Sequence, residues 1–181
     1  MCGRFQFDLT AANEFYGIAG SLTGFKTGEV FPTNSILVLS ESREPLVMTW
    51  GYPRFGSKSG SIINARSETA HERPMFRKSL AERRCIIPTT GFFEWDGQKQ
   101  KHRFNLPHTR ALYLAGLWND FDGALKCVIL TTTANPSMDG IHDRMPVVLS
   151  QSILDDWLKS LKIAYAILHE TPPALEHILV S

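Results

Sequence analysis

The sequence predicts an α+β fold built on a mostly antiparallel sheet, and two observations predict it. Short apolar runs bounded by turn residues outnumber the segments that show the 3.6-residue period of a helix. Hairpin-type turn signals recur between those runs, such as the Asp96-Gly97 pair. The length of 181 residues and a hydrophobic share of 43% suffice for one sizeable core, so we expect a single domain over residues 1–181.

The amino-terminal half is expected to mix short helices with short strands. Thr10 has the residue type of an N-cap and begins a predicted helix over residues 10–16. A second helix is predicted over residues 75–83, where apolar residues recur at the i, i+4 spacing. Glycine and serine over residues 55–60 indicate a flexible loop. The predicted strands of this half are 36–39, 46–48 and 61–64.

The carboxy-terminal half is expected to be richer in strands and to end in helices. Ser150 is an N-cap residue type that precedes a helix with its apolar residues on one face. Thr171 followed by Pro172 has the order of a cap and a first helical residue, and it predicts a closing helix. The predicted strands of this half are 84–87, 90–95, 102–106, 111–118, 125–133 and 145–149.

Charge and cysteine content argue against several classes of protein. A net charge of +1 gives no global attraction to nucleic acid. No apolar run approaches the roughly 18 residues of a membrane span, and no secretory signal pattern is present, so we expect no membrane partner. Three widely spaced cysteines argue against a disulfide framework and fit the reducing cytoplasm. No CxxC, HxxxH or HExxH pattern occurs, so we expect neither a metal nor another cofactor.

Local charge differs from this global balance. Residues 72–84 hold five basic side chains, including Arg73 and Arg77, against two acidic ones. Such a run is most simply a solvated helix face, and the alternative is part of an anion-binding surface.

Cys2 directly follows Met1 at the start of the chain. After removal of Met1, Cys2 would carry an α-amine and a thiol on adjacent carbons, a 1,2-aminothiol that no internal cysteine can reproduce. This pair is a reactive group, and the rest of the sequence has to show whether a site is built around it. The alternative is a small apolar residue near a chain end. Cys85 and Cys127 lie inside apolar runs and are expected to be buried thiols without a chemical role.

Two further segments place polar side chains where chemistry is possible. Glu94 lies inside the aromatic segment GFFEW. By alternation it faces solvent, whereas in an apolar cleft its pKa would be raised and it could act as a general acid. Asn64 and Arg66 flank Ala65, so on a strand they face the same side. That pair either holds an anion or a sugar oxygen, or it marks a strand exit with a surface arginine.

His142 stands in a cluster of ionisable residues with Asp143 and Arg144, shortly before the apolar run 147–149. Histidine titrates near neutrality and could relay a proton. The alternative is a His–Asp pair that stabilises a turn.

Several segments carry motifs that occur together in one order. They are MCGRF at the start, INARSET over 63–69, RCIIP over 84–88, GFFEW over 91–95, AGLW over 115–118 and IHDRMP over 141–146. This set resembles the SRAP family, the SOS response-associated peptidases, across nearly the whole chain. The resemblance implies a strand-dominated α+β domain with a barrel-like core, a few flanking helices and a basic groove that runs past the N-terminus.

The resemblance also implies an activity and a set of site residues. The activity is the sensing of abasic sites in single-stranded DNA through a covalent protein–DNA crosslink. We also expect a monomer that acts without a cofactor in the cytoplasm, near the nucleoid in a bacterial host. Carried over by motif, Cys2 is the crosslinking residue, and the polar groups of the site are Asn64, Glu94 and His142. Arg4, Arg66 and Arg144 match arginines on the DNA side of the family. The other DNA-binding candidates are Arg73 and Arg77, from the basic run over residues 72–84, and Phe55. Phe55 stands where relatives carry tryptophans and is interpreted as a stacking surface.

The expected product is a thiazolidine formed after Met1 is removed, with weak abasic-site lyase activity as a side reaction. Two other classes of function stay open. In an N-terminal-nucleophile peptidase or amidase, Cys2 would attack an amide and product would be released. In a non-covalent single-strand binder, the basic surface would do the work and blocking the thiol would leave retention on DNA unchanged.

Overall fold

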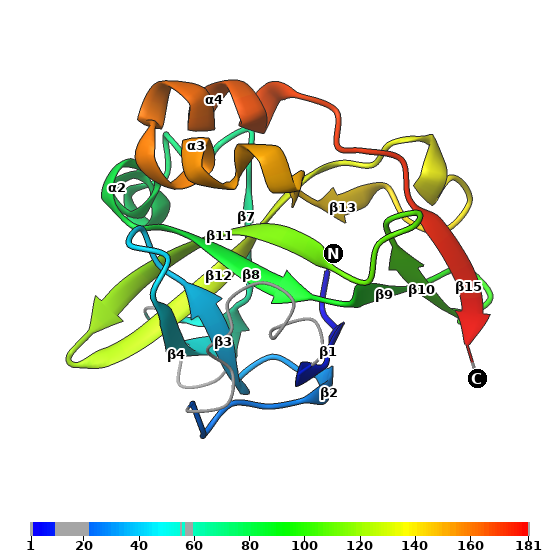
Figure 1. Cartoon of the computed structure of the whole chain (residues 1–181), viewed down its shortest axis with the longest axis horizontal. Helices are drawn as coiled ribbons and strands as arrows, with labels where there is room; N and C mark the ends of the chain where they lie inside the picture. Colours follow the sequence, from blue (N-terminus) through cyan, green and yellow to red (C-terminus); the bar gives the residue numbers. More distant parts are fainter. Residues whose placement is uncertain (1, 10–21, 55, 57–59, 181) are drawn as a thin grey trace.

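The structure of the protein, a computed structural model, describes residues 2–9, 22–54, 56 and 60–180 (Figure 1). The predicted helix over residues 10–16, most of the predicted loop over 55–60, and Phe55 lie outside these ranges. The described chain forms a mostly antiparallel α+β fold, as the sequence predicts. Among the described residues, no helix has the length and apolar character needed to cross a membrane.

A five-stranded sheet holds the N-terminal strand β1 between its central strand and one edge strand. Its order is β15-β10-β9-β1-β2, and every pairing is antiparallel. Because β1 pairs with β2 on one side and β9 on the other, the residues just before β1 lie beside the end of β9. The strands are β1 (Phe5–Phe7), β2 (Gly28–Val30), β9 (Gly91–Trp95), β10 (Lys101–Asn105) and β15 (Glu176–Val180).

A larger, eight-stranded sheet is organised around its long strand β12 (Ala124–Thr133). The end of β12 pairs in parallel with β7 (Asn64–Arg66) and antiparallel with β13 (Arg144–Pro146). This arrangement brings Asn64 and the segment before Arg144 to the same end of the sheet. The remaining strands are β3 (Ser35–Leu39), β4 (Pro45–Trp50), β8 (Arg84–Thr89), β11 (Leu112–Phe121) and β14 (Val148–Leu149), and β5 (Tyr52–Pro53) pairs separately with β6 (Ser61–Ile62).

Three helices gather on one side of the sheets in Figure 1: α2 (Pro74–Glu82), α3 (Leu154–Lys159) and α4 (Leu161–His169). The buried Arg84 ties two of them to β8. Its guanidinium donates hydrogen bonds to the carbonyls of Leu80 and Ala81 in α2 and of Trp157 and Leu158 in α3, at 2.6–2.9 Å. A cation is favoured at helix C-termini, where the last carbonyls have no partner within the helix.

The predicted closing helix after Thr171 is wrong. Residues 171–175 form no regular element, and β15 follows as a strand on β10. Pro172 precedes Pro173, and a residue before proline is forced out of the helical region of backbone conformation. The carbonyls of both prolines also accept hydrogen bonds from Asn135 Nδ2, at 2.9 and 3.0 Å. The sequence signal for a cap was therefore overridden by the second proline and by a tertiary contact.

Other boundaries differ from those predicted. The single helix expected after Ser150 is divided into a 3₁₀ turn (Gln151–Ile153), α3 and α4, because the Ser160 side chain caps a new helix by accepting a hydrogen bond from the Ile163 N–H at 3.3 Å. The hairpin at Asp96-Gly97 is present, but its loop spans residues 96–100. Asp96 Oδ1 accepts hydrogen bonds from two loop N–H groups, so the carboxylate shapes a longer loop than a two-residue turn.

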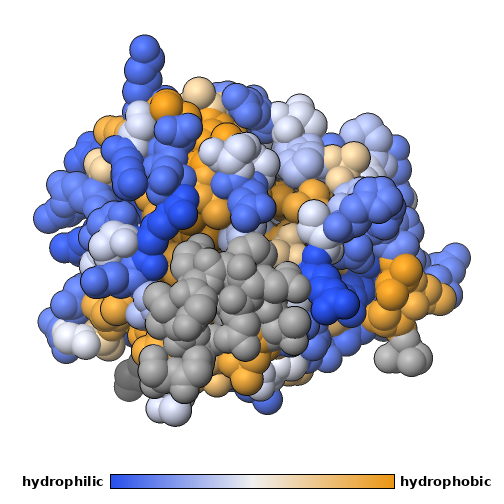
Figure 2. All heavy atoms as spheres, in the orientation of Figure 1, coloured by the Kyte–Doolittle hydropathy of each residue, from blue (hydrophilic) through white to orange (hydrophobic). Residues whose placement is uncertain are grey.

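β15 is an edge strand with an apolar surface. Ile178 and Leu179 are 56% and 60% exposed. Figure 2 shows apolar surface on the side of the molecule where β15 runs.

Candidate active site

The pairing of β1 with β9 sets the position of the N-terminal segment. Phe5 is the register partner of Phe92, and the Phe93 N–H donates a hydrogen bond to the Arg4 carbonyl at 2.9 Å. The chain before Arg4 therefore continues along the end of β9 that carries Glu94. Two residues that are 92 positions apart in the sequence, Cys2 and Glu94, meet at one end of the five-stranded sheet.

Cys2 is completely buried. Burial raises the pKa of its thiol far above the ordinary value, and the nearby negative charge of Glu94 raises it further. The Arg4 backbone N–H bonds to the sulfur and acts in the opposite direction, but it is the smaller influence. Cys2 is therefore a protonated thiol at neutral pH in this state of the protein, and it needs a base before it can act as a thiolate nucleophile.

Glu94 lies in an apolar cleft and is only 5% exposed. The pKa of its carboxyl is raised from 4.5 to about 7, mainly by burial, and the charge of Asp143 acts in the same direction. The exposed alternative, which simple alternation favours, is wrong because both faces of β9 are covered. Phe92 stacks on Phe104 on one face, and Lys101 lies over Phe93 on the other. A carboxyl with a pKa near 7 is present in both protonation states at neutral pH, which suits a general acid and base.

Asn64 connects β7 to the N-terminal segment. Its Nδ2 donates a hydrogen bond to the Cys2 carbonyl at 2.9 Å. Its Oδ1 is buried and has no hydrogen-bond partner among the described residues. A buried acceptor without a partner costs free energy, so this atom is suited to accept a hydrogen bond from a ligand. The interpretation that Asn64 and Arg66 share one side of a strand agrees with β7, in which the intervening Ala65 is buried.

His142 lies in the turn before β13, and its backbone geometry selects one tautomer. The Arg144 N–H donates to His142 Nδ1 at 2.9 Å, so Nδ1 is the unprotonated nitrogen and Nε2 carries the proton. Asp143 Oδ1 also lies 2.9 Å from Nδ1, but the Asp143 side chain is 87% exposed, and an unprotonated Nδ1 has no proton to donate to it. Burial lowers the pKa of His142, so the neutral imidazole is the prevailing form.

The predicted polar site residues thus converge from four segments of the chain. Cys2 contacts Asn64, Glu94 acts electrostatically on Cys2, and Asp143 acts on Glu94, which brings the 142–143 turn to the same place. Among the described residues, no group of three or more histidine, cysteine, aspartate and glutamate side chains is arranged to hold a metal ion. Cys85 and Cys127 are both fully buried, as expected.

The predicted DNA-binding arginines occupy different environments. Arg66 and Arg73 are exposed and line, together with Asn64, a hollow of about 410 Å³ whose floor includes Met75 and Phe76. Arg77 is exposed on α2. These cations are therefore accessible to an anionic ligand next to Asn64.

Arg144 and Arg4 are instead held by carboxylates that were not predicted from the sequence. Arg144 forms a two-bond pair with Glu68, at 2.5 and 3.0 Å, and also donates to the Thr131 carbonyl at 2.7 Å. Arg4 donates to Glu29 at 3.0 Å. Its guanidinium lies 4.1 Å from the ring centre of Phe31 and 4.9 Å from that of Trp95. No local signal marks Glu68 or Glu29 as a partner, because each pair joins residues that only the sheets bring together.

Comparison with known proteins agrees with this geometry. The family model described as "SOS response associated peptidase (SRAP)" matches residues 1–180. The chain is 34% identical to the abasic site processing protein YoqW of Bacillus subtilis, over 87% of this chain and 80% of that protein. It is 31% identical to the abasic site processing protein YedK of Escherichia coli, over 88% and 80%. A protein from Bordetella bronchiseptica has the same fold, with a TM-score of 0.83 at 24% identity over 99% of this chain and 100% of that chain.

Proposed function

Since the chain belongs to the SRAP family, we propose that it captures abasic sites in single-stranded DNA through a covalent bond to Cys2 after Met1 is removed. Two relatives, YoqW and YedK, are named abasic site processing proteins, which supports a substrate of this class. The observation that carries the proposal is the buried Glu94 carboxyl, with a pKa of about 7, beside the buried thiol of Cys2. A general acid next to a 1,2-aminothiol is what capture of a sugar aldehyde requires.

The covalent step needs no cofactor. An abasic site interconverts between a closed sugar and an open-chain aldehyde. The free α-amine of Cys2, with an ordinary pKa of about 7.7 to 8.0, attacks C1′, and loss of water gives an imine. The thiol S–H then adds across the C=N bond, with sulfur bonding to C1′ and the proton passing to nitrogen. The product is a five-membered thiazolidine, and ring closure is favoured by the high effective concentration of a thiol on the neighbouring carbon.

Each polar residue has a role that follows from its environment. Protonated Glu94 donates to the sugar ring oxygen during opening, and its carboxylate form then accepts the thiol proton that the buried Cys2 does not release by itself. Neutral His142 offers its Nε2 proton to an oxygen of the sugar or phosphate. Asn64 holds the Cys2 backbone in place and offers its free Oδ1 to the reacting amine or a sugar hydroxyl.

The exposed Arg66 and Arg73 are proposed to hold the phosphates that flank the abasic nucleotide, with Arg77 further along α2. Arg4 would join them once the DNA competes with Glu29, and Arg144 once it competes with Glu68. A transient imine also allows β-elimination, so weak lyase activity accompanies capture. Removal of Met1 is assigned either to the protein itself, as the family name suggests, or to a methionine aminopeptidase.

Intact mass of the purified protein, with and without a single-stranded abasic oligonucleotide, tests the proposal. Crosslinking predicts a protein that lacks Met1 and a new species whose mass equals protein plus DNA minus one water. A peptidase or amidase would instead release product and leave no DNA adduct. A non-covalent binder would retain DNA only under native conditions and would be insensitive to a blocked thiol. Either of these two outcomes overturns the crosslinking proposal.

A further inference from the structure

A second cationic site lies on the outer face of the five-stranded sheet, away from the Cys2 site. It is a hollow of about 380 Å³ at the far end of β9 and β10, lined by Asp8, Thr90, Arg103, Asn105 and Arg110, among others. Thr90 and Glu94 are four residues apart on the chain. At about 3.3 Å per residue, the offset from Glu94 along the strand is about 13 Å. Arg103 pairs with Phe93 in the strand register, so its side chain is also on the opposite face of the sheet from Glu94.

Arg103 lines this hollow, and one of its N–H groups makes no hydrogen bond to the described residues. Its Nη2 donates to the Thr90 carbonyl at 3.2 Å. Its Nε is buried and has no hydrogen-bond partner among the described residues. The absence of a side chain at Gly91 makes this position possible, because a Cβ there would lie 3.1 Å from Arg103 Nε and 2.7 Å from the Phe104 carbonyl oxygen. The Arg103 side chain as a whole is only half-buried and lines the hollow, so its guanidinium can meet an anion there.

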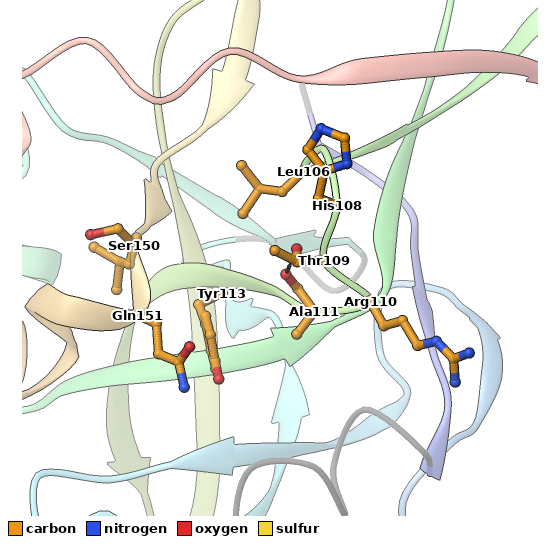
Figure 3. A pocket seen from close by; sticks show the side chains of 9 residues that line it. Leu106, His108, Thr109, Arg110, Ala111, Tyr113, Ser150 and Gln151 are labelled. Carbon is orange, nitrogen blue, oxygen red and sulfur yellow. Dashed lines mark hydrogen bonds between the residues drawn. The ribbon is translucent and has the colours of Figure 1, made fainter.

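Arg110 supplies the second cation. Arg110 borders a neighbouring hollow of about 490 Å³. Figure 3 shows that its side chain extends away from Tyr113 and Gln151. Arg110 also lines the hollow that holds Arg103, and it forms no ion pair with any residue that the structure describes. The Thr109 hydroxyl donates a hydrogen bond to the Ala111 carbonyl at 2.8 Å, which stabilises the loop that contains Arg110.

The distribution of compensating charge distinguishes this hollow from the rest of the outer face. Nearer the Cys2 site, Glu29 accepts hydrogen bonds from both Arg4 and Lys101, at 3.0 and 2.7 Å. Arg103 stands two residues after Lys101 on β10 and so faces the same side, but it has no carboxylate partner among the described residues. With Asp8 as the acidic lining residue, the two arginines leave a net charge of +1. That charge matches a monoanion better than a dianion.

We propose that the Arg103–Arg110 hollow binds one backbone phosphodiester of the single strand whose abasic site is held at Cys2. This proposal rests on the proposed function and extends it to a nucleotide beyond the reacting one. A phosphodiester is a monoanion with two free oxygens, and an arginine fork can contact both of them. The Arg103–Arg110 hollow would hold the strand in place and take no part in the reaction. It would therefore increase the affinity for long strands without changing the rate of the covalent step.

The test compares wild type with Arg110→Ala and the double variant Arg103→Ala/Arg110→Ala. The control is Lys162→Ala, which removes an equal charge from an exposed position on α4. Binding is measured on an undamaged strand of about fifteen nucleotides, within the known site sizes of single-strand binders, as a function of salt. Loss of one phosphate contact should flatten the log–log salt slope by about 0.7 and weaken binding about fivefold at 0.1 M salt. Arg110→Ala should show part of this loss, and Lys162→Ala none.

Adduct formation on an abasic trinucleotide, which is too short to reach the hollow, gives the second readout. The rate should match wild type in every variant. If wild type forms no adduct while the salt slope still falls in the variants, the crosslinking function fails and the phosphodiester site stands. If long-strand binding in the double variant equals wild type while its melting temperature is unchanged, the site is overturned. The site is also overturned if inorganic phosphate saturates the hollow without competing with the strand.

Discussion

Asn64 donates a hydrogen bond to the backbone carbonyl of Cys2, and this contact fixes the N-terminal segment to a strand of the other sheet. Asn64 sits on β7, which is held by β12, whereas Cys2 precedes β1, which is held by β9. The bond therefore joins the two sheets at the residue proposed to react. It uses the Cys2 carbonyl, so it would leave the thiol of Cys2, and the α-amine that removal of Met1 would expose, available for the proposed chemistry.

Cys2→Ala is expected to keep ordinary DNA binding but to lose the heat-resistant adduct, because an imine without ring closure hydrolyses. A form with a tag before Cys2 should also form no adduct, since its α-amine is blocked while its thiol remains. Denaturing gels of each protein after incubation with an abasic single strand make the measurement. Persistent adduct in the tagged form, with the tag still present by mass, would contradict the aminothiol mechanism.

The rate of adduct formation should have a bell-shaped pH profile. Adduct formation needs a neutral α-amine, with an ordinary pKa of about 7.7 to 8.0, and a protonated Glu94, with a pKa of about 7, so the rate should peak between these values and fall on both sides. Glu94→Gln should slow both formation and reversal, because one group delivers the proton in one direction and accepts it in the other. The variant should also lose the alkaline fall. Reversal is measured by competition with excess unlabelled abasic DNA, and an unchanged exchange rate would remove Glu94 from the mechanism.

Glu94 should also make folding stability depend on pH. Its pKa is raised in the folded protein, from 4.5 to about 7, so its favourable contribution is complete below pH 4.5 and is lost as pH rises through 7. A shift of this size corresponds to about 3 kcal/mol at most. The gain in unfolding free energy from Glu94→Gln should therefore be larger at pH 8 than at pH 4.5, measured by urea unfolding. Equal differences at the two pH values would show that the carboxyl is not buried.

Asn64→Ala should slow adduct formation by about tenfold, the loss expected for one hydrogen bond of about 1 to 1.5 kcal/mol that positions the nucleophile. Single-strand binding to undamaged DNA should change little, because the phosphate-binding arginines are retained. The rate of adduct formation at saturating DNA reports the reaction step alone, and so separates it from changes in DNA affinity. A variant that lost affinity and kept its maximal rate would show that Asn64 holds DNA rather than Cys2.

Glu68→Gln should strengthen single-strand binding and steepen its salt slope by up to about 0.7, because it releases the Arg144 charge for a phosphate. Arg144 holds the pKa of Glu68 below its ordinary value through their hydrogen bonds, so the carboxylate is ionised in the wild type. Glu170→Gln removes an exposed acid at the end of α4 and is the matched control. Arg66→Ala should act in the opposite direction. If Glu68→Gln binds DNA no better than its control, Arg144 does not contact the strand.

Several features could be predicted from the sequence because they depend on local pattern. Strand alternation predicted that Asn64 and Arg66 share a side, and apolar surroundings predicted that Cys85 and Cys127 are buried. The Asp96-Gly97 pair predicted a hairpin, although the Asp96 side chain lengthened its loop. Each of these depends on residues within a few positions of one another.

The tertiary structure alone decided the features that depend on distant partners. Glu94 is buried because both faces of β9 are covered by neighbouring elements, and this burial raises its pKa. The same applies to the end of the chain, where β10 offers a free edge and Asn135 holds two proline carbonyls, so a strand replaced the helix that Thr171 indicated. The sequence alone determined which reactive groups the protein carries. Their charge states and partners were decided by the packing of the two sheets. Burial and ion pairing depend on residues that are distant in the sequence, so no local segment can predict them.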